Sequence, residues 1–526
     1  MLKVDPHDKE KLIDPLFVRP GLRYWLILLI LMALIAWGGL FYIRQYVLGL
    51  GETGMNRPTY WGVYMVNFIF FIGISHAGTL ISAILRVTGA EWRRPITRVA
   101  EAITAFALVV GTLQIIIDMG RPDRLFSVIL YGRLQSPILW DVISVTAYFL
   151  GSVTYLYLPL IPDAALLRDH CPPSAPAWRR KLYTLLALGW RGNRTQWLRL
   201  EKAISVMAVF IIPVAVSVHT IISWILATTV QPGWHSSIFG PYFVVGAIFS
   251  GIGALFLAMT AVRRVLGLEA YIRARQYRNL GLLFITMNLV WFYFTYAEHL
   301  SIAAGQQSEE FPVLASKLWG EFAPGFWSMV VLMAVALWVL VVPQMMPVER
   351  LRAPVFQPRY ALASIGMAGF ILFSLSMKPD MLAGADIAGI STRNLAWGLL
   401  ALLVVVTLLS LTAWLKPRPV TATAIAAAGV VVGMWLERWN IIVPTMTHPR
   451  LVPYALYRPT LTEISLTAAS LALFCLMFLI FFKLFPAVSI WEIAEGRVIE
   501  EARSQVAIPV PEPSETRQQR RWGFKR

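Results

Sequence analysis

Residues 25–43, WLILLILMALIAWGGLFYI, contain no charged side chain. About 18 or more consecutive apolar residues are enough to cross the hydrocarbon core of a bilayer as a helix. Similar stretches recur along the chain, which is 57% hydrophobic and 14% charged, with a mean hydropathy of +0.64. The sequence therefore predicts an all-α, polytopic membrane protein embedded in a lipid bilayer.

Apolar length predicts twelve membrane spans. Orientation follows from the basic residues, which collect on the cytoplasmic side of membrane proteins. Of the 46 Lys and Arg, 35 fall on the side of the N-terminus and 10 on the other side. Both termini are therefore expected in the cytoplasm, which requires an even number of spans: twelve, or ten without the ninth and tenth. The predicted spans are 25–47, 61–85, 96–118, 137–160, 203–227, 241–263, 277–300, 322–347, 360–377, 395–415, 420–440 and 461–486.

Charge and cysteine content exclude several functions. The net charge of +17 lies in short basic runs between apolar segments, which is typical of a cytoplasmic membrane face and not of a nucleic-acid-binding surface. Cys171 and Cys475 are too few for the four thiolates that an iron–sulfur cluster normally requires. Any such cluster is therefore expected in a partner subunit.

Ionisable residues inside predicted spans are the candidate functional residues, because a charge in a membrane is costly. Five of the six positions are expected in the outer half of the membrane, and His76 nearer its middle. A polar stripe at helical spacing accompanies Asp141, which indicates a helix face turned towards protein or water. The six positions are His76, Asp118, Asp141, His219, Glu298 and His299, and the stripe is Asp141, Ser144, Tyr148, Ser152 and Tyr155.

Each candidate also has a purely structural interpretation. Asp118 could cap its helix or pair with Arg121 or Arg124, and Asp141 could complement the positive end of a helix dipole. The two histidines could form hydrogen bonds between helices, and Glu298 could lie at the membrane surface without a role. Glu437-Arg438 is expected to be an internal ion pair that holds two helices together.

Three chemistries suit imidazole and carboxylate groups near one membrane face. A quinol needs hydrogen-bond partners and proton acceptors for its two hydroxyls, and His, Asp and Glu supply both. A haem b held by His76 and His219 is the second possibility, although these residues are expected at different depths. A transporter or proton channel is the third, but the sequence shows no clear internal repeat.

Four segments resemble the NrfD/PsrC family, the membrane subunits of polysulfide reductases. Within it, the chain is most similar to the ActC-type subunit of alternative complex III. The resemblance covers about residues 20–345 and 425–495. Alternative complex III subunits often carry His where Asp118 stands, which is a departure. The segments are Gly73-Ile-Ser-His76-Ala-Gly78-Thr-Leu-Ile-Ser82, Asp118-Met-Gly-Arg-Pro122, Ser136-Pro-Ile-Leu-Trp-Asp141-Val, and Gly433-Met-Trp-Leu-Glu437-Arg438-Trp-Asn-Ile-Ile-Val-Pro444.

The resemblance implies two four-helix bundles, formed by the second to fifth spans and by the sixth, seventh, eighth and eleventh. It implies a site for quinol, expected to be menaquinol, near the outer face of the first bundle, without haem or an iron–sulfur cluster in this chain. His76, Asp118 and Asp141 would be its catalytic residues. Electrons would pass to an iron–sulfur subunit and multihaem cytochrome c subunits, beside other membrane subunits in a bacterial inner membrane.

Four further residues are expected to bind the quinone: Tyr148, His219, Glu298 and His299. An ActF-like paralogue, with a role in proton movement or structure, is the alternative. The polar tail after Phe485 is expected to be disordered or bound to a partner.

These expectations divide the chain into seven parts. The parts are a cytoplasmic N-tail at 1–24, the first helix with first-bundle helices at 25–160, a cytoplasmic interfacial linker at 161–202, the end of the first bundle and the second bundle at 203–347, an insertion with two possible extra helices at 348–419, the last two helices at 420–486 and a cytoplasmic C-tail at 487–526.

Overall fold

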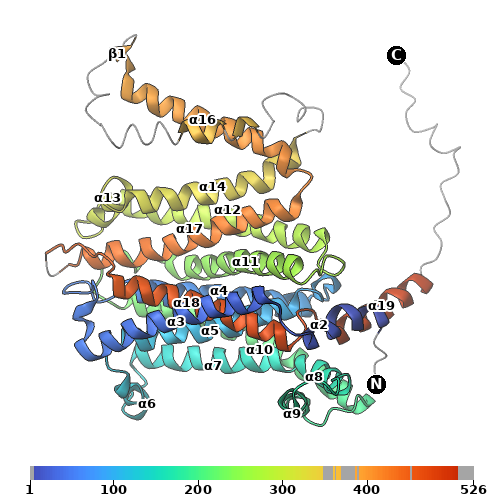
Figure 1. Ribbon diagram of the computed structural model, residues 1–526. Coiled ribbons are helices and arrows are strands. Elements are labelled where there is room, and N and C mark those ends of the chain that lie inside the picture. The colour runs from blue at the N-terminus through green and yellow to red at the C-terminus, as the bar shows by residue number, and fades with distance from the viewer. Residues whose placement is uncertain are drawn as a thin grey trace, which may run out of the picture.

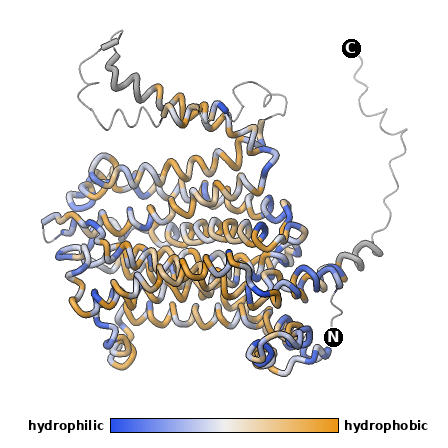
Figure 2. Tube along the Cα trace, viewed as in Figure 1, coloured by the Kyte–Doolittle hydropathy of each residue, from blue (hydrophilic) through white to orange (hydrophobic). Residues whose placement is uncertain are grey.

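The computed structural model of the protein describes residues 5–346, 359–361, 363–368, 386–387, 390–450 and 453–506. The described chain is almost entirely helical, and a two-residue antiparallel pair, β1 and β2, is its only named sheet. The long helices run side by side (Figure 1). Hydrophobic residues dominate their middle sections, and hydrophilic residues gather towards the two ends of the bundle (Figure 2). This is the distribution that a bilayer requires.

Ten helices in the described part of the chain are long and apolar enough to cross a membrane. They confirm the first eight predicted spans and the last two. They are α3 (Leu22–Leu48), α4 (Val63–Val87), α5 (Thr97–Asp118), α7 (Pro137–Tyr157), α10 (Arg194–Ala227), α11 (Phe239–Val265), α12 (Ala274–Gly305), α14 (Ala323–Met345), α17 (Pro419–Thr447) and α18 (Leu461–Leu484).

The predicted ninth and tenth spans have a different outcome. Most of 360–377 lies outside the described residues. The tenth corresponds to the 24-residue helix α16 (Thr392–Leu415), whose fully described apolar stretch is Leu402–Leu415. The described part of the fold therefore has ten candidate membrane helices, with α16 beside α14 at one edge of the bundle (Figure 1).

Short helices occupy the loops and the chain ends. They are α1 (Pro6–Asp8), the π-helix η1 (Lys9–Ile13), α2 (Asp14–Phe17), η2 (Leu50–Glu52), η3 (Glu91–Arg93), η4 (Pro122–Arg124), α6 (Ser127–Leu130), α8 (Leu160–Asp169), α9 (Ala177–Leu186), α13 (Phe311–Leu318) and α19 (Ile490–Val506), and the strands are β1 (Asp386–Ile387) and β2 (Ile390–Ser391). We call the end of the bundle with α2, α8, α9 and α19 the terminal end, and the end with α6 and α13 the far end (Figure 1). The basic residues predict that the terminal end is cytoplasmic.

Two four-helix bundles make up the core, as expected. Helices α4, α5, α7 and α10 contact one another in the first bundle, and α11, α12, α14 and α17 in the second. The bundles meet where α11 packs against α4 and α10. Helices α3 and α18 pack together along the side of α4 and α5.

Helix α4 is the central element of the first bundle. In its most apolar stretch 88% of the residues are buried, against 6% for α3, which therefore has a surface suited to lipid. A Cβ atom at Gly78 would lie 1.8 Å from the carbonyl oxygen of Ala100, so glycine is needed there for α4 and α5 to approach each other. This close contact brings the polar faces of the two helices together.

Candidate functional site

Asp118 and Asp141 lie towards the far end of the first bundle. Asp118 is the last residue of α5, and Asp141 lies in the first turns of α7. Each has one buried carboxylate oxygen, Oδ1, without a hydrogen-bond partner among the described residues. Arg121, the suggested partner of Asp118, pairs instead with Asp123 at 3.0 Å. The suggested ion pair between Asp118 and Arg121 is therefore wrong.

A further carboxylate, the buried Glu463, lies within electrostatic range of Asp118. It belongs to the first turn of α18, and its Oε2 accepts hydrogen bonds from the backbone N–H groups of Gly54 and Thr460, both at 2.8 Å. The hydroxyl of Tyr457 donates to its Oε1 at 2.5 Å. Sequence analysis missed Glu463. The Thr-x-x-Glu capping signature at 460–463 was the only available signal, and it indicates a helix start and not a site.

His76 and His219 are in direct contact at the centre of the first bundle. Their ring centroids are 4.0 Å apart, with an interplanar angle of 71°, and both side chains are fully buried. The expected difference in depth is therefore wrong. The end of its span places His219 in the outer half, but α10 crosses α4 so that the two imidazole rings lie side by side.

The two histidines differ in their hydrogen bonds. Nδ1 of His76 lies 2.8 Å from the carbonyl oxygen of Ile72, and Nε2 lies 2.5 Å from that of Ala215. Neither ring nitrogen of His219 has a partner among the described residues. A neutral imidazole has a single N–H, so His76 can donate to both carbonyls only when it holds a second proton.

The histidine pair does not fit a haem held between the two rings. Axial ligands approach the iron from opposite faces of the macrocycle, each with a free ring nitrogen. Rings in edge-to-face contact leave no room for a porphyrin between them. Nε2 of His76 is also turned to a backbone carbonyl.

The three predicted catalytic residues do not meet at one point. Thr104 of α5 donates to the carbonyl oxygen of Ser75 at 2.7 Å, so the level of His76 lies about 20 Å along α5 from Asp118. Tyr148 lies beside His76, with ring centroids 5.1 Å apart, and Asp141 precedes it on α7 by two turns, about 10 Å. The site therefore has a central histidine level, with Asp141 about 10 Å and Asp118 about 20 Å beyond it towards the far end.

A polar ladder continues from the histidine level towards the terminal end. We define it as the facing hydroxyl pairs of α4 and α7 together with Glu101 of α5. The pairs are Ser75 with Tyr148 at 3.5 Å, Thr79 with Ser152 at 3.5 Å and Ser82 with Tyr155 at 3.4 Å. Ser82 also donates to Oε1 of Glu101 at 2.9 Å. The predicted stripe on α7 therefore faces a matching stripe on α4.

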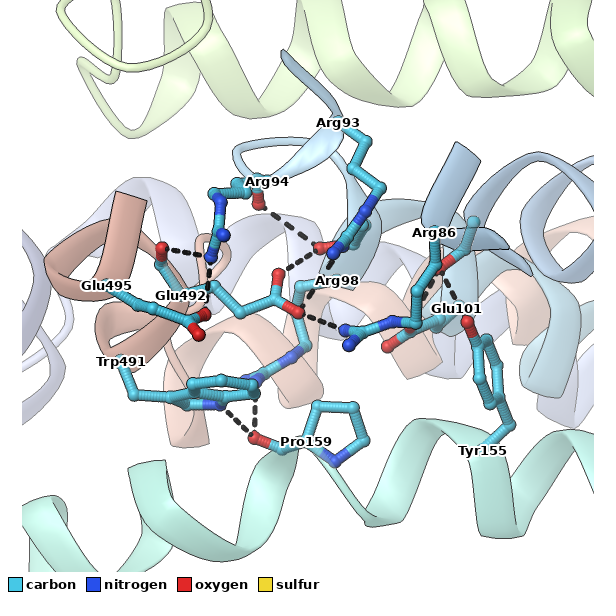
Figure 3. A network of polar contacts seen from close by, with 12 residues as sticks. Arg86, Arg93, Arg94, Arg98, Glu101, Tyr155, Pro159, Trp491, Glu492 and Glu495 are labelled. Atoms are coloured by element: carbon cyan, nitrogen blue, oxygen red, sulfur yellow. Dashed lines mark hydrogen bonds and ion pairs between the residues drawn. The ribbon is translucent and has the colours of Figure 1, made fainter. Parts of the chain in front are cut away.

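An arginine cluster lies next to the last members of the ladder, Glu101 and Tyr155, at the terminal end (Figure 3). Glu492 of α19 pairs with Arg86, lies 3.5 Å from Arg93 and accepts a hydrogen bond from Thr97 at 2.9 Å. Burial alone would raise the pKa of Glu492, but Arg86 and Arg93 hold it below its ordinary range. Asp163 of α8 likewise pairs with Arg98 at 2.9 Å and accepts from the backbone of α19.

The cluster corrects the expected disorder for the described part of the tail after Phe485; residues 507–526 lie outside the described residues. Residues 490–506 form a helix whose first residues, Ile490 and Trp491, are 2% exposed. The indole N–H of Trp491 donates to the carbonyl oxygen of Pro159 at 2.9 Å. These apolar residues lie within a polar stretch of sequence, so hydropathy alone did not distinguish them from a solvated tail.

The second bundle contains the predicted Glu437-Arg438 ion pair. The two side chains are 3.0 Å apart and each is 1% exposed. Both residues lie on α17, so the pair does not itself join two helices as expected; the indole N–H of Trp291 on α12 donates to Glu437 at 2.9 Å and provides the link. The Arg438 guanidinium lies over the ring of Phe243, 4.9 Å from its centroid, and this ring in turn neighbours His219.

Glu298 and His299 lie at the far end of the second bundle, away from the first-bundle residues. Glu298 accepts a hydrogen bond from Ser236 at 2.5 Å, and both residues line a cavity of about 30 Å³. A cavity of that size holds water but not a quinone ring. Lys317 lines the same cavity, and burial lowers its pKa to about 8 despite the opposing effect of Glu298. Sequence analysis missed Lys317, because it lies in a loop helix outside the spans.

The described residues bring together no group of three His, Cys, Asp or Glu side chains that could hold a metal ion. The side chains found together are instead acids, imidazoles and hydroxyls. Such groups bind and transfer protons and form hydrogen bonds to a polar ring.

Comparisons with known proteins agree with this architecture. The chain is 28% identical over 389 residues, 71% of its length and 83% of the relative's, to a protein of Halobacterium salinarum that is provisionally named as a membrane subunit of dimethyl sulfoxide reductase. It is 25% identical over 217 residues, 39% of this chain and 48% of the relative, to a selenate reductase subunit of Mesobacillus selenatarsenatis. Over 284 residues, 53% of this chain and 61% of the relative, it is 24% identical to an Hdr-like menaquinol oxidoreductase integral membrane subunit of Archaeoglobus fulgidus.

The family model for the polysulphide reductase NrfD matches residues 51–374. This range contains the whole first bundle and three helices of the second, α11, α12 and α14. Because the match covers more than half of the 526 residues, the protein belongs to the NrfD family of polysulphide reductase membrane subunits.

Proposed function

We propose that this protein is the membrane subunit of a respiratory complex and oxidises quinol near the far end of its first bundle. The names of the relatives support the general role, because they denote subunits of two reductases and of a menaquinol oxidoreductase. Menaquinol is the proposed donor, on the analogy of the Archaeoglobus relative. The site would face the outside of a bacterial inner membrane.

The observation that carries the proposal is the pair of buried, unpartnered carboxylate oxygens on Asp118 and Asp141 within the described chain. A buried oxygen without a hydrogen-bond partner needs one, and a hydroquinone hydroxyl supplies a donor. Oxidation of one quinol to quinone releases two protons and two electrons. Asp141 would accept a proton from a quinol hydroxyl as a general base, and Asp118, about 10 Å nearer the far end, would take protons on towards the outside.

The central histidines would be the next proton acceptors. A protonated His76 would donate to the carbonyl oxygens that face its two ring nitrogens, which supports this role. Tyr148 would orient the quinol ring or pass protons between Asp141 and the histidines. Glu298 and His299 lie around a cavity too small for the ring, so we propose that they act with water.

The two electrons would leave for a partner. The donor sets that we describe suit protons better than metal ions. An iron–sulfur subunit and multihaem cytochrome c subunits of an alternative complex III are the proposed acceptors, with this chain as the ActC-type subunit. That assignment rests on the motif resemblance around His76 and Glu437, whereas Asp118 departs from it, because such subunits often carry His there.

A second candidate function is proton movement, as in an ActF-like subunit. The polar ladder favours it, because hydroxyls and Glu101 continue from the histidines towards the terminal end. In that case the chain would exchange protons with the cytoplasm as well as release them outside. The two functions are compatible if quinol oxidation drives the movement.

Substitution of Asp141 in the assembled complex tests the proposal. Asp141→Asn keeps the side-chain shape and removes the base. General base catalysis is typically worth about 10²–10⁴-fold, so quinol oxidation should fall at least about tenfold with assembly unchanged. Tyr148→Phe should give a smaller loss. Glu298→Gln tests the competing location in the second bundle and should cost less than Asp141→Asn. Normal turnover in Asp141→Asn with loss in Glu298→Gln would contradict the proposed location.

A further inference from the structure

A cavity of about 540 Å³ opens at the terminal end of the molecule, remote from the carboxylates of the proposed quinol site. Four chain segments enclose it: the N-terminal residues, the loop between α4 and α5, the start of α12, and α19. It is of the size that small-molecule sites have, about 300–1,000 Å³. Its lining includes Trp92, Arg94, Arg273, Arg275, Ile493 and Arg497.

Basic side chains predominate in the lining of the cavity. Four arginines line the cavity, and Glu91 is the one acidic residue among its described lining side chains. Arg94 has two acidic partners, Glu91 and Glu495, at 2.6 and 2.7 Å, and Arg497 also has two, Asp5 and Asp8, so these two arginines carry no spare positive charge. These pairs fix two guanidinium groups at the cavity wall.

The other two arginines remain free to bind an anion. Arg273 donates through Nε to the carbonyl oxygen of Ala270 and forms no ion pair with the described residues, and Arg275 makes neither a hydrogen bond nor an ion pair with them. Both side chains are exposed, and they flank the N-terminus of the 32-residue helix α12. The positive end of the helix dipole adds to their attraction for a negative group.

The remaining wall is mixed: His7, Tyr271 and Gln276 are polar, and an apolar part lies beside them. Trp92, Pro95, Ile493 and Ile499 come from the first bundle and from α19. A site for a small soluble anion has no need for such a surface, whereas a phospholipid has a phosphate and adjoining apolar glycerol ester and acyl groups. Basic pockets between membrane helices on the cytoplasmic side are known as sites for anionic headgroups.

We propose that this cavity binds a phosphate-bearing anion in the form of an anionic phospholipid headgroup. Arginine suits the phosphate, because its planar guanidinium can donate two parallel hydrogen bonds. Arg273 and Arg275 hold the phosphate, and Trp92 and Ile493 contact the apolar part of the lipid. Because Arg94 follows α4 of the first bundle and Arg275 begins α12 of the second, the lipid joins the two bundles at the membrane surface.

Lipid binding to the purified, delipidated full-length protein tests the proposal. Dioleoylphosphatidylglycerol and dioleoylphosphatidylcholine are titrated in detergent and followed by native mass spectrometry. The test variant is Arg273→Gln/Arg275→Gln. The matched control, Arg180→Gln/Arg278→Gln, removes the same charge from exposed arginines on α9 and α12 that do not line the cavity. Arg275→Gln alone loses no described bond, so it serves if the double variant folds poorly.

Phosphatidylglycerol should bind the natural protein more tightly than phosphatidylcholine. The test variant should lose about tenfold or more in affinity for it, as expected for a charge-assisted hydrogen bond, and the control should not. Equal binding of the two lipids, or equal losses in variant and control, would overturn the proposal. A third arm adds excess inorganic phosphate: retention of the lipid supports the lipid source, whereas full displacement would assign the site to a soluble phosphate. Asp141→Asn should bind the lipid normally, which separates this test from that of quinol oxidation.

Discussion

His219 packs its imidazole edge to face against that of His76, with ring centroids 4.0 Å apart, and joins the interiors of the two bundles. His76 belongs to α4 and is held by two carbonyl oxygens. His219, on α10, has neither ring nitrogen bonded within the described residues and borders Phe243, over which Arg438 lies. An unsatisfied, fully buried imidazole is costly, and such groups are usually retained for a ligand, a water or a proton.

His219→Phe separates a packing role from a chemical one. Phenylalanine fills a similar volume and removes two unsatisfied nitrogens, so the stability of the protein should be unchanged or slightly higher. If His219 holds a proton or a water during turnover, quinol oxidation should fall by about tenfold or more. Thermal unfolding and turnover of the assembled complex measure the two effects. Full activity in His219→Phe would leave the residue with packing alone.

The contact between the two histidines also predicts the optical spectrum. Because their rings touch, they cannot ligate one haem from opposite faces. The isolated subunit should therefore show no Soret band from a bis-histidine haem at this position. A stoichiometric b-type spectrum that disappears in both His76→Ala and His219→Ala would contradict this interpretation.

Local sequence patterns predicted the helices and one side of the ladder. Apolar length located ten membrane helices to within a few residues at most ends, because burial in lipid demands it whatever the neighbours are. Helical spacing placed Tyr148, Ser152 and Tyr155 on one face, which the structure confirms. The Glu437-Arg438 pair was also predictable, because two adjacent opposite charges within a span must be neutralised.

Contacts between distant segments could not be predicted in this way. Glu492 reaches Arg86 from a tail that looked polar and separate, and the partners of a charge do not follow from local hydropathy. Glu101 lies near basic residues at the end of a span, so it did not stand out, yet it is 2% exposed and bonded to Ser82. The depth of His219 depended on how α10 crosses α4, which one sequence does not specify.

Membrane orientation is tested by cysteine labelling in a background without Cys171 and Cys475. Ser308→Cys lies at the far end and Ser174→Cys at the terminal end, and both serines are exposed, so the two substitutions are matched in chemistry. The excess of Lys and Arg at the terminal end predicts that an impermeant maleimide labels intact cells at 308 and not at 174. Both positions should react after the membrane is permeabilised. The opposite pattern would place Asp118 and Asp141 at the cytoplasmic face.

Glu492 should control the docking of α19 on the first bundle. Its carboxylate faces Arg86, Arg93 and the hydroxyl of Thr97 in a fully buried position. Removal of one partner from a buried ion pair typically costs about 3–5 kcal/mol, because the other charges stay buried without compensation. Glu492→Gln should therefore release α19, measured as faster proteolysis within 490–506. Glu495→Gln is the control, because the Glu495 side chain is 38% exposed and such pairs contribute about 1 kcal/mol or less.

The docking of α19 should also depend on pH in a defined direction. The arginines hold the pKa of Glu492 below its ordinary value of 4.5, against the effect of burial. A carboxylate with a lowered pKa in the docked state stabilises that state fully above its ordinary pKa, and the stabilisation is lost as the pH falls through the lowered value. Proteolysis of α19 should thus be slow and constant from neutral pH down to about 5 and accelerate below it. In Glu492→Gln this residue cannot titrate, so the acceleration should be weaker. An unchanged acid response in that variant would assign the pH dependence to another group, with Asp163 the next carboxylate in contact with α19.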